Sequence, residues 1–590
     1  MLLAMKSTLQ LSLIVWLALL LALGASEPGP SALAFEQPES ESGFQPKPLV
    51  KATRHMVIAA HPLAAEAGLA MLRKGGSAVD AGIAVQMVLN LVEPQSSGIG
   101  GGAFILYWDA GAKKLTSIDG RETAPTAATP DLFLDDSGNP LPRDAAMASG
   151  LSVGVPGVLA ALALAHEKYG KLPWAELFQP AIALAREGFP VSERLAKQIA
   201  EMDPDSFAPD ARTFFFGSQG RPLPAGYKLT NLALAETLEV IARGGPDTFY
   251  RGDLARDIAT AVQSDPRRPG TLTADDLAAY RAKEREPVCI LYRLHHVCGM
   301  GPPSSGGVAV GQVLALIAPF DLGPSPLDPR ATHIIAEAER LAFADRARYL
   351  ADPDFVPVPL AGLLDRAYLA ERRALIDPDR ALDHVAAGSP PNTRQGAFGN
   401  DRSPESAGTS HISIVDDQGN AFSMSTSIEN AFGARSMVRG FLLNNQLTDF
   451  SFSPADEGGR PVANRVEPGK RPRSSMDPAI VLAKDGAPRF VLGSPGGPAI
   501  ILYNVKAIVA LIDWGLDPAE TASLVNFGAT ENALLLEPGA AWDRLASSLA
   551  AMGHDIRRMP LTSGQHIIAI TPDGLEGGAD PRRDGAALGD

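Results

Sequence analysis

Cysteine is scarce in this sequence, and so are runs of basic or apolar residues. The 590 residues include two cysteines, Cys289 and Cys298, which excludes a disulfide framework and a cysteine-rich metal centre. The formal net charge is −15 and no basic run occurs, which argues against nucleic acid as a partner. Beyond the amino terminus, no stretch is long and apolar enough to span a membrane. The 45% hydrophobic content nevertheless suffices for a large globular core.

The cysteines and histidines also give no metal signature. His295 and His296 are adjacent in a predicted strand, so their side chains point to opposite faces. We therefore expect no metal site. The cysteines lie in a segment typical of a hairpin with its turn near Arg293, where an exported chain could join them in a bond of local structural value.

The amino terminus has the pattern of a secretory signal peptide. Lys6 precedes an apolar run at residues 11–25, and Ala32-Leu33-Ala34 supplies a small-x-small cleavage signal. The run is shorter than the roughly 20 residues that span a bilayer, so a retained anchor is the weaker alternative. We expect residues 1–34 to be removed and the mature protein to be soluble, in the periplasm or secreted.

The rest of the chain alternates helical and extended patterns. Alanine-rich helices are predicted at residues 62–73, 78–91, 155–169 and 174–186, with a strand at residues 103–108. Residues 387–407 are rich in Gly, Ser, Pro and Asn and predict a linker. Residues 409–427 then predict a β-hairpin, and residues 489–511 predict a strand, a Gly-rich turn and a helix. The chain from Glu576 onward resembles a disordered tail.

The junction between linker and hairpin carries the first chemical signal. Gly408 is followed by Thr409, whose hydroxyl can attack the preceding carbonyl in a turn that a glycine leaves uncrowded. This attack, followed by hydrolysis of the resulting ester, would leave Thr409 with a free amino group, which has a reference pKa of about 7.7–8.0. One residue would then provide both nucleophile and base. A Gly-Thr pair alone is more often a simple turn.

A second signal lies in the turn at residues 493–497. Backbone N–H groups at the start of a helix favour developing negative charge, so Gly496 and Gly497 are candidates for an oxyanion hole. A plain Gly-Gly turn is the alternative interpretation.

Several motifs in order resemble the γ-glutamyltranspeptidase family, across essentially the whole mature chain. They are TSH at residues 409–411, LNNQ at 443–446, KRPRSSM at 470–476 and GSPGG at 493–497, preceded by GGSAVDA at 75–81, SGIGGG at 97–102, GRETAP at 120–125 and PPSSGG at 302–307. The resemblance implies a four-layer αββα sandwich of the amino-terminal-nucleophile hydrolase class. It also implies one precursor cut between Gly408 and Thr409 into intertwined subunits, residues 35–408 and 409–590, that pair as a heterodimer.

The resemblance also implies roles for individual residues. Thr409 matches the nucleophile, and Ser427 stands where the family has a second threonine that supports it. Other matches concern the two charged ends of a glutamyl substrate: Arg121, Ser474 and Ser475 for the α-carboxylate, and Gln446 and Asp449 for the α-ammonium. The implied reaction passes a γ-glutamyl group from glutathione or a related compound to water, an amino acid or a dipeptide.

One departure from the family pattern concerns the α-ammonium side. Glu429 stands where the family commonly has asparagine, and a second carboxylate there can strengthen amine binding or shift the choice of donor. The segment between Gln446 and Ser474 also looks shorter than in members with a lid loop.

Four other interpretations compete. A β-lactam acylase of the same fold would act on glutaryl-type donors that lack an α-amino group, which the presence of Gln446 and Asp449 disfavours. A periplasmic binding homologue without activity would leave the joint presence of all these residues unexplained. The GLSVG match to a hydrolase nucleophile elbow at residues 150–154 follows a poor strand. The glycines at residues 98–102 fail the dinucleotide pattern at Ala103.

Overall fold

A computed structural model describes residues 39–590, apart from residues 327, 394–395, 404, 406–407 and 531–532. The predicted signal peptide, residues 1–34, lies outside this part of the chain. Among the described residues, no helix combines the length and the apolar character that a membrane span requires.

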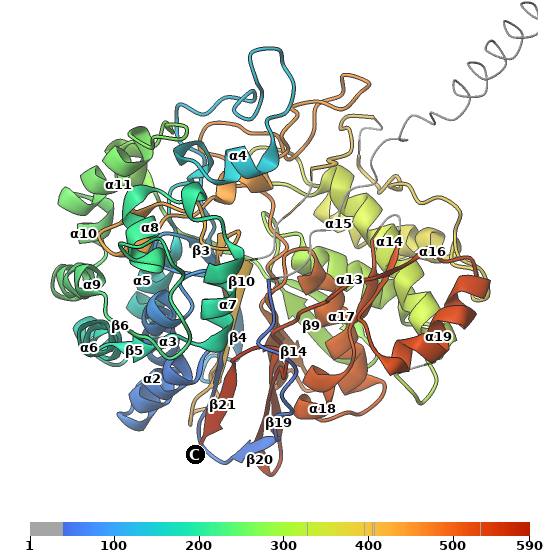
Figure 1. Cartoon of the computed structure of the whole chain (residues 1–590). Helices are drawn as coiled ribbons and strands as arrows, with labels where there is room; N and C mark the ends of the chain where they lie inside the picture. The colour runs from blue at the N-terminus through green and yellow to red at the C-terminus, as the bar shows by residue number, and fades with distance from the viewer. Residues whose placement is uncertain (1–38, 327, 394–395, 404, 406–407, 531–532) are drawn as a thin grey trace, which may run out of the picture. The chain divides into compact units, whose positions relative to one another are not determined.

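Two seven-stranded antiparallel sheets form the centre of the described chain (Figure 1). The first sheet has the order β21 (Ala586–Gly589), β2 (Met56–Ala59), β10 (Gly408–Val415), β11 (Ala421–Glu429), β3 (Gly102–Asp109), β4 (Lys114–Gly120) and β7 (Lys283–Arg285). The second has the order β1 (Val50–Ala52), β20 (Gly574–Ala579), β19 (His566–Thr571), β15 (Pro488–Gly493), β14 (Ala479–Leu482), β9 (His295–Gly299) and β8 (Val288–Tyr292).

The two sheets pack face to face because strand side chains alternate. Met56 and Ile58 of β2 join a core shared with Val491 of β15 and Ile568 of β19. Val57, between them, belongs instead to the core formed with the helices. Both faces of the first sheet are therefore buried, which explains why β2 and β3 are apolar at consecutive positions.

Helices cover the outer face of each sheet (Figure 1). The first sheet is covered by α2 (Pro62–Arg73), α3 (Ala78–Val92) and α5 (Val158–Tyr169). The second is covered by α13 (Gly306–Ile317), α17 (Ala499–Ile512) and α18 (Pro518–Ser523), and α14 (Pro329–Tyr349) packs on α13. This order of layers confirms the predicted αββα sandwich.

Shorter elements surround the sandwich. The other helices are α4 (Arg143–Met147), α6 (Gln179–Glu187), α7 (Glu193–Glu201), α8 (Pro209–Phe216), α9 (Leu232–Gly244), α10 (Asp247–Tyr250), α11 (Asp253–Gln263), α12 (Ala274–Ala279), α15 (Leu360–Leu363), α16 (Arg366–Arg373) and α19 (Ala540–Ala551). Small sheets pair β5 (Phe189–Pro190) with β6 (Lys228–Leu229), β12 (Met437–Val438) with β13 (Phe441–Leu442), and β17 (Leu534–Leu536) with both β16 (Phe527–Ala529) and β18 (Ile556–Arg558).

Local sequence explains how the central layer is held in place. Ser77 and Asp80 form a reciprocal capping box that starts α3, and Asp80 also accepts hydrogen bonds from the backbone of Lys171 and Leu172. The helix that packs under β10 and β11 is thus fixed at its amino end by the GGSAVDA motif.

The predicted hairpins are confirmed. The strands β10 and β11 pair in antiparallel register around the turn at Asp417, and β8 pairs with β9 around the turn containing Arg293. A disulfide joins Cys289 to Cys298 across the second hairpin. The strand, turn and helix expected at residues 489–511 appear as β15 and α17.

The prediction of a disordered carboxy-terminal tail is wrong. Residues 574–579 form β20 inside the second sheet, and β21 pairs with β2 at the edge of the first. The glycine-rich sequence hides these strands because backbone pairing and close packing, rather than large apolar side chains, hold them in place. Two buried arginines add ion pairs, Arg582 with Glu537 and Arg583 with Glu39.

Removing residues 580–590 is therefore expected to unfold the protein or to lower its stability by at least about 3–5 kcal/mol, because buried ion pairs lose one partner. Soluble yield and the midpoint of thermal unfolding measure the effect. The variant Asp590→Ala, which removes the side-chain pairs with Arg73 and His55 but keeps β21 and the buried arginines, is the control and should keep a midpoint close to that of the intact chain. A stable truncated protein would contradict the prediction.

Candidate active site

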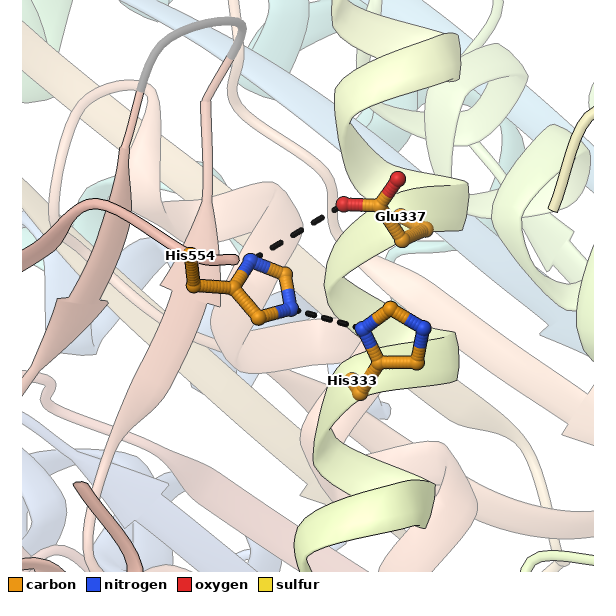
Figure 2. A group of neighbouring side chains, drawn as sticks. All are labelled: His333, Glu337 and His554. Atoms are coloured by element: carbon orange, nitrogen blue, oxygen red, sulfur yellow. Dashed lines mark hydrogen bonds and ion pairs between the residues drawn. The ribbon is translucent and has the colours of Figure 1, made fainter. Parts of the chain in front are cut away.

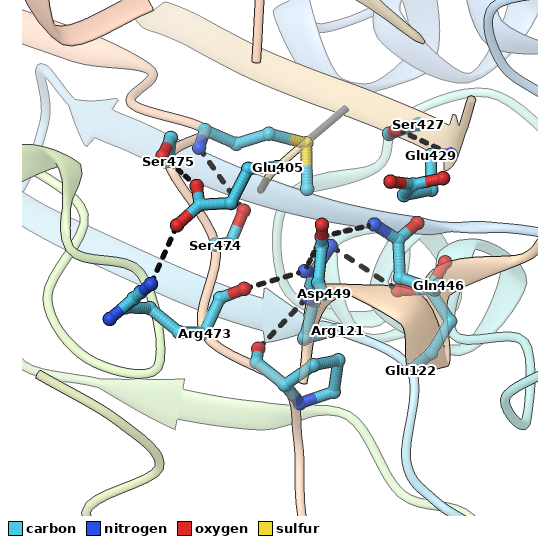
Figure 3. Close-up of polar contacts among 12 residues, drawn as sticks. Arg121, Glu122, Glu405, Ser427, Glu429, Gln446, Asp449, Arg473, Ser474 and Ser475 are labelled. Carbon is cyan, nitrogen blue, oxygen red and sulfur yellow. Dashed lines mark hydrogen bonds and ion pairs between the residues drawn. The ribbon is translucent and has the colours of Figure 1, made fainter. Parts of the chain in front are cut away.

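A small cavity lies where β10 and β11 meet the turn that follows β15. It is lined by Arg121, Glu405, Thr409, Ser427, Glu429, Gln446, Asp449, Ser474, Ser475, Met476, Gly497 and Ile500. Every predicted site residue except Gly408 and Gly496 is in this set, and those two directly precede lining residues. Figure 3 shows Glu405, Ser474 and Ser475 grouped on one side and Ser427 with Glu429 on the other. Segments far apart in the sequence thus converge on Thr409.

An irregular register places Thr409 at the end of the central hairpin. Gly408 pairs with Glu429 and Ser410 pairs with Thr426, so Thr409 alone faces two residues of β11. Such a bulge re-aims side chains at the rim of a sheet. A Cβ on Gly408 would lie 2.2 Å from the carbonyl oxygen of Glu429, so this close approach requires glycine.

The hydroxyl of Ser427 contacts the carbonyl that precedes Thr409. The backbone N–H of Glu429 donates to Ser427 Oγ at 2.8 Å, and the Ser427 hydroxyl donates to the carbonyl oxygen of Gly408. A hydrogen bond at that oxygen withdraws electrons from the carbonyl carbon. The carbonyl next to Thr409 is therefore polarised in the uncut chain.

The glycine turn contributes Gly497 to the lining of the same cavity. Gly496 and Gly497 have φ angles of +138° and +56°, a backbone conformation that favours glycine. A Cβ on Gly496 would also lie 2.7 Å from the ring of Tyr503. Both glycines precede α17, whose amino end directs its positive dipole toward this turn.

Arg121, Asp449 and Gln446 form one corner of the cavity (Figure 3). Asp449 Oδ2 accepts from Arg121 Nη2 at 2.5 Å and from Gln446 Nε2 at 2.8 Å. Arg121 also donates to the backbone carbonyls of Pro472 and Arg473. The residue expected to grip a substrate carboxylate is thus fully buried and paired with the residue expected to bind the ammonium.

Glu429 lines the cavity from the other strand. Its Oε2 accepts from Asn445 Nδ2, and its Oε1 lies 3.6 Å from Arg143 Nη2. Its φ of +82° is unusual for a non-glycine residue and directs the side chain at the end of β11. Glu429, which replaces the family asparagine, therefore adds a carboxylate whose charge Arg143 already compensates.

Comparison with known proteins identifies the family of this chain. The family model described as Gamma-glutamyltranspeptidase matches residues 64–590. This chain belongs to that family. A glutathione hydrolase proenzyme of Escherichia coli (strain K12) is 39% identical over 561 residues, covering 92% of both chains.

Proteins named as acylases are also similar to this chain. An Acylase ACY 1 proenzyme of Pseudomonas sp. (strain SE83) is 36% identical over 546 residues, covering 91% of this chain and 93% of its own. The crystal structure of a cephalosporin acylase from Bacillus halodurans superposes with a TM-score of 0.82 at 29% identity, covering 94% of this chain and 99% of that one. Glutathione hydrolases and acylases are therefore both similar to this chain over most of its length.

Three residues at the family site were missed by sequence reasoning. Ser475 Oγ accepts from Arg346 Nη2 at 2.6 Å and donates to Glu405 Oε2 at 3.0 Å, and Arg473 donates to Glu405 Oε1 at 2.6 Å. Arg473 stood inside a recognised motif without an assigned role. Arg346 lies on α14 and Glu405 in the predicted linker, where no sequence signal pointed to the site.

The rival nucleophile-elbow motif is structural. Its Ser152 is buried in a short 3-10 helix, Gly150–Ser152, and donates to the backbone carbonyls of Met147 and Ser149. The hydroxyl is engaged with the backbone instead of being presented at a cleft.

A second polar cluster, apart from the cavity, contains His333, Glu337 and His554 (Figure 2). His333 Nε2 donates to the carbonyl of Asp377, so its Nδ1 accepts from His554 Nε2 at 2.7 Å. Two nitrogen ligands of a tetrahedral zinc would lie roughly 3.3 Å apart, given bonds of about 2.0–2.1 Å. Glu337 already pairs with Arg340 at 2.7 Å. The hydrogen bond between His333 and His554 therefore acts as a structural tether that connects α14 to the segment before β18.

This tether predicts a dependence of stability on pH. Burial, together with the charges of His333 and Arg340, lowers the pKa of His554 to about 3, against about 6.5 in an unfolded chain. Between these values only the unfolded chain binds the proton, so the free energy of unfolding decreases as pH falls. The variant His554→Gln keeps a donor for His333 but has no such proton.

Urea unfolding between pH 6.5 and 4 should therefore show a pH slope that is shallower in His554→Gln by up to about 1.4 kcal/mol per pH unit. The exposed His384→Gln is the matched control and should retain the slope of the unmodified protein. Equal slopes for His554→Gln and the unmodified protein would contradict the assignment.

Proposed function

We propose that this protein cuts itself between Gly408 and Thr409 and then acts as a γ-glutamyltransferase and glutathione hydrolase. The observation that carries the proposal is the single cavity in which Thr409 meets Ser427, Gly497, Asp449 and Ser474. Family membership and the similarity to glutathione hydrolase proenzymes support it.

Self-cleavage begins with attack by Thr409 Oγ on the carbonyl carbon of Gly408. The C–N bond breaks as the C–O bond forms, and the nitrogen takes the proton of the hydroxyl. Water then hydrolyses the ester, which leaves a carboxylate on Gly408 and restores the hydroxyl of Thr409, whose amino group was freed when the C–N bond broke. Ser427 supports the first step because it donates to the oxygen that becomes negative.

In turnover, the amino group of Thr409 accepts the proton of its own hydroxyl while Oγ attacks the γ-carbonyl of the donor. The leaving amine takes that proton as the tetrahedral intermediate collapses to a γ-glutamyl ester. Water or the amine of an amino acid or dipeptide then attacks the ester and releases Thr409. Backbone N–H groups of Gly496 and Gly497 would stabilise the oxyanion in both steps.

Substrate orientation follows from charge. Asp449, Gln446 and Glu429 would receive the α-ammonium, and Arg121, Ser474 and Ser475 would hold the α-carboxylate, so both ends of glutamate would be read. We further propose that the precursor is exported, that residues 35–408 and 409–590 form a heterodimer, and that the reaction needs no cofactor because the protein supplies every group.

An acylase of the same family is the second candidate, since acylases resemble the whole chain. A glutaryl donor lacks the α-amino group, which would leave Asp449 and Gln446 without a substrate partner. Glutaryl amide and glutathione, tested side by side, therefore separate the two functions. Release of glutamate at the higher kcat/KM supports the transferase and hydrolase, and preferential release of glutarate assigns the acylase.

The variant Thr409→Ala should remain one uncut chain and release no glutamate from glutathione, because it lacks the attacking hydroxyl. Intact mass and amino-terminal sequencing check the cut, and a glutamate assay checks turnover. The unmodified protein should give a new chain that begins at Thr409. Cutting elsewhere, or processing in Thr409→Ala, would overturn the assignment of the nucleophile.

Ser427→Ala should slow self-cleavage by about 10²–10³-fold, the cost of losing one donor to a developing oxyanion. Ser427→Thr keeps the hydroxyl and should process at a rate close to that of the unmodified protein. A time course of the two bands on a denaturing gel measures both rates. Equal rates in Ser427→Ala and Ser427→Thr would show that the hydrogen bond to Gly408 has no role in the cut.

A further inference from the structure

A second cavity, of about 700 Å³, lies between α5 and the helices α9 and α10, and the segment that joins α12 to β7 completes its lining. It shares no lining residue with the cavity around Thr409. Ala160, Ala163 and Leu164 of α5 line it, and the small alanine side chains leave its space open. Sites for small organic molecules have volumes of about 300–1,000 Å³, so this cavity has the size of such a site.

Three aromatic side chains line this cavity: Trp174, Tyr250 and Tyr280. The two tyrosine rings stack with their centroids 5.8 Å apart and an angle of 8° between their planes. Each of the three residues donates its polar hydrogen to a backbone carbonyl, at 3.2 Å for Trp174, 3.0 Å for Tyr250 and 2.7 Å for Tyr280. These hydrogen bonds hold the rings in place before any ligand binds. The cavity therefore offers a preformed apolar surface to a planar molecule.

The exposed part of the lining carries more positive than negative charge. Its charged residues are Arg243, Arg251 and Arg281 against Glu167 and Asp247. Arg251 lies 3.8 Å from Asp247, and Arg281 donates to two backbone carbonyls at 2.6 and 2.9 Å. Within the described part of the chain, no carboxylate forms an ion pair with Arg243 or Arg281. After the charge of Glu167 is counted, one positive charge remains, which fits a single negative charge on a ligand.

We propose that this second cavity binds a small organic molecule that has a planar apolar body and one carboxylate. The body lies against the rings of Trp174, Tyr250 and Tyr280, and the carboxylate pairs with Arg243 and Arg281. A dianion such as a phosphate monoester exceeds the available positive charge, and a cation is repelled by the arginines. The inference does not depend on the proposed function, because it involves no residue that lines the cavity around the nucleophile.

The first experiment measures the binding of three matched probes to the purified protein by isothermal titration calorimetry. Dansylglycine, dansylglycinamide and dansylethylenediamine share one planar body and end in a carboxylate, a neutral amide and an ammonium group. Dansylglycine should bind with one-to-one stoichiometry and with a Kd at least about fivefold below that of dansylglycinamide, the effect expected of one or two exposed ion pairs. Dansylethylenediamine should bind most weakly. Equal affinity for the three probes overturns the proposal.

The second experiment replaces the groups assigned to the carboxylate. Arg243→Gln combined with Arg281→Gln should raise the Kd of dansylglycine at least about fivefold and leave that of dansylglycinamide within about twofold. Both arginines are exposed, so the double variant should keep its fold, which circular dichroism checks. Arg256→Gln is the matched control and should change neither Kd, since Arg256 pairs with Asp253 on α11 and lies outside the cavity. Unchanged binding of dansylglycine in the double variant contradicts the proposal.

A third experiment locates the probe by energy transfer from tryptophan to the bound dansyl group. Trp174→Phe keeps an aromatic ring and should lower the transfer to dansylglycine by more than Trp514→Phe does. Trp514 follows α17, which covers the second sheet, and lies outside the cavity. Equal transfer in the two variants would place the probe elsewhere and overturn the proposal. By calorimetry, Ala163→Trp should fill the space and weaken the binding of dansylglycine and dansylglycinamide alike.

Competition with L-glutamate separates this cavity from the one around Thr409. The proposed function assigns L-glutamate to the cavity around Thr409, so it should not displace dansylglycine from the protein. Displacement would place the probe at the nucleophile and overturn the inference. Thr409→Ala should likewise leave the Kd of dansylglycine unchanged. If Ala163→Trp does not fold, the double arginine variant and the two tryptophan variants decide.

Discussion

The pairing of β10 with β11 is the constraint on which the rest of the site depends. These strands occupy the centre of the first sheet, with β2 and β3 on their outer sides, helices beneath and the second sheet above. Their register breaks only at Thr409, so a rigid scaffold ends in one irregular position. That arrangement presses the carbonyl of Gly408 against the hydroxyl of Ser427, and a residue larger than glycine at 408 would separate them.

Charge compensation governs the cavity around that position. Arg121 is paired with Asp449, Arg143 lies near Glu429, and Arg346 and Arg473 enclose Glu405. A buried charge without a partner costs several kcal/mol, so each of these groups keeps an opposite charge within reach. Under the proposed function, a substrate with both an ammonium and a carboxylate would replace such internal ion pairs, which a neutral substrate could not do.

Both glutathione hydrolase proenzymes and acylases are similar to this chain. A carboxylate on the acyl group is common to glutamyl and glutaryl donors, and the α-amino group distinguishes them. Under the proposed function, the residues for the carboxylate meet the requirement that both donors share, and Asp449 and Gln446 distinguish the two donors. Glu429, held by Asn445 and near Arg143, adds a further acidic group on the discriminating side.

The sequence by itself determined the layered fold, the family and most of the cavity. Periodic patterns located the central hairpin and the helix after the glycine turn, because those elements bury regular faces, and the ordered motifs located Thr409, Ser427 and Ser475. Tertiary structure decided the rest. The strands β20 and β21 are held by pairing with partners distant in sequence, so their glycine-rich sequence carries no periodic signal. Tertiary structure also brings together Arg346 of α14, Glu405 of the segment before β10 and Arg473 of the loop before β14. Electrostatic interaction depends on distance in space, and the order of residues in the sequence does not encode that distance.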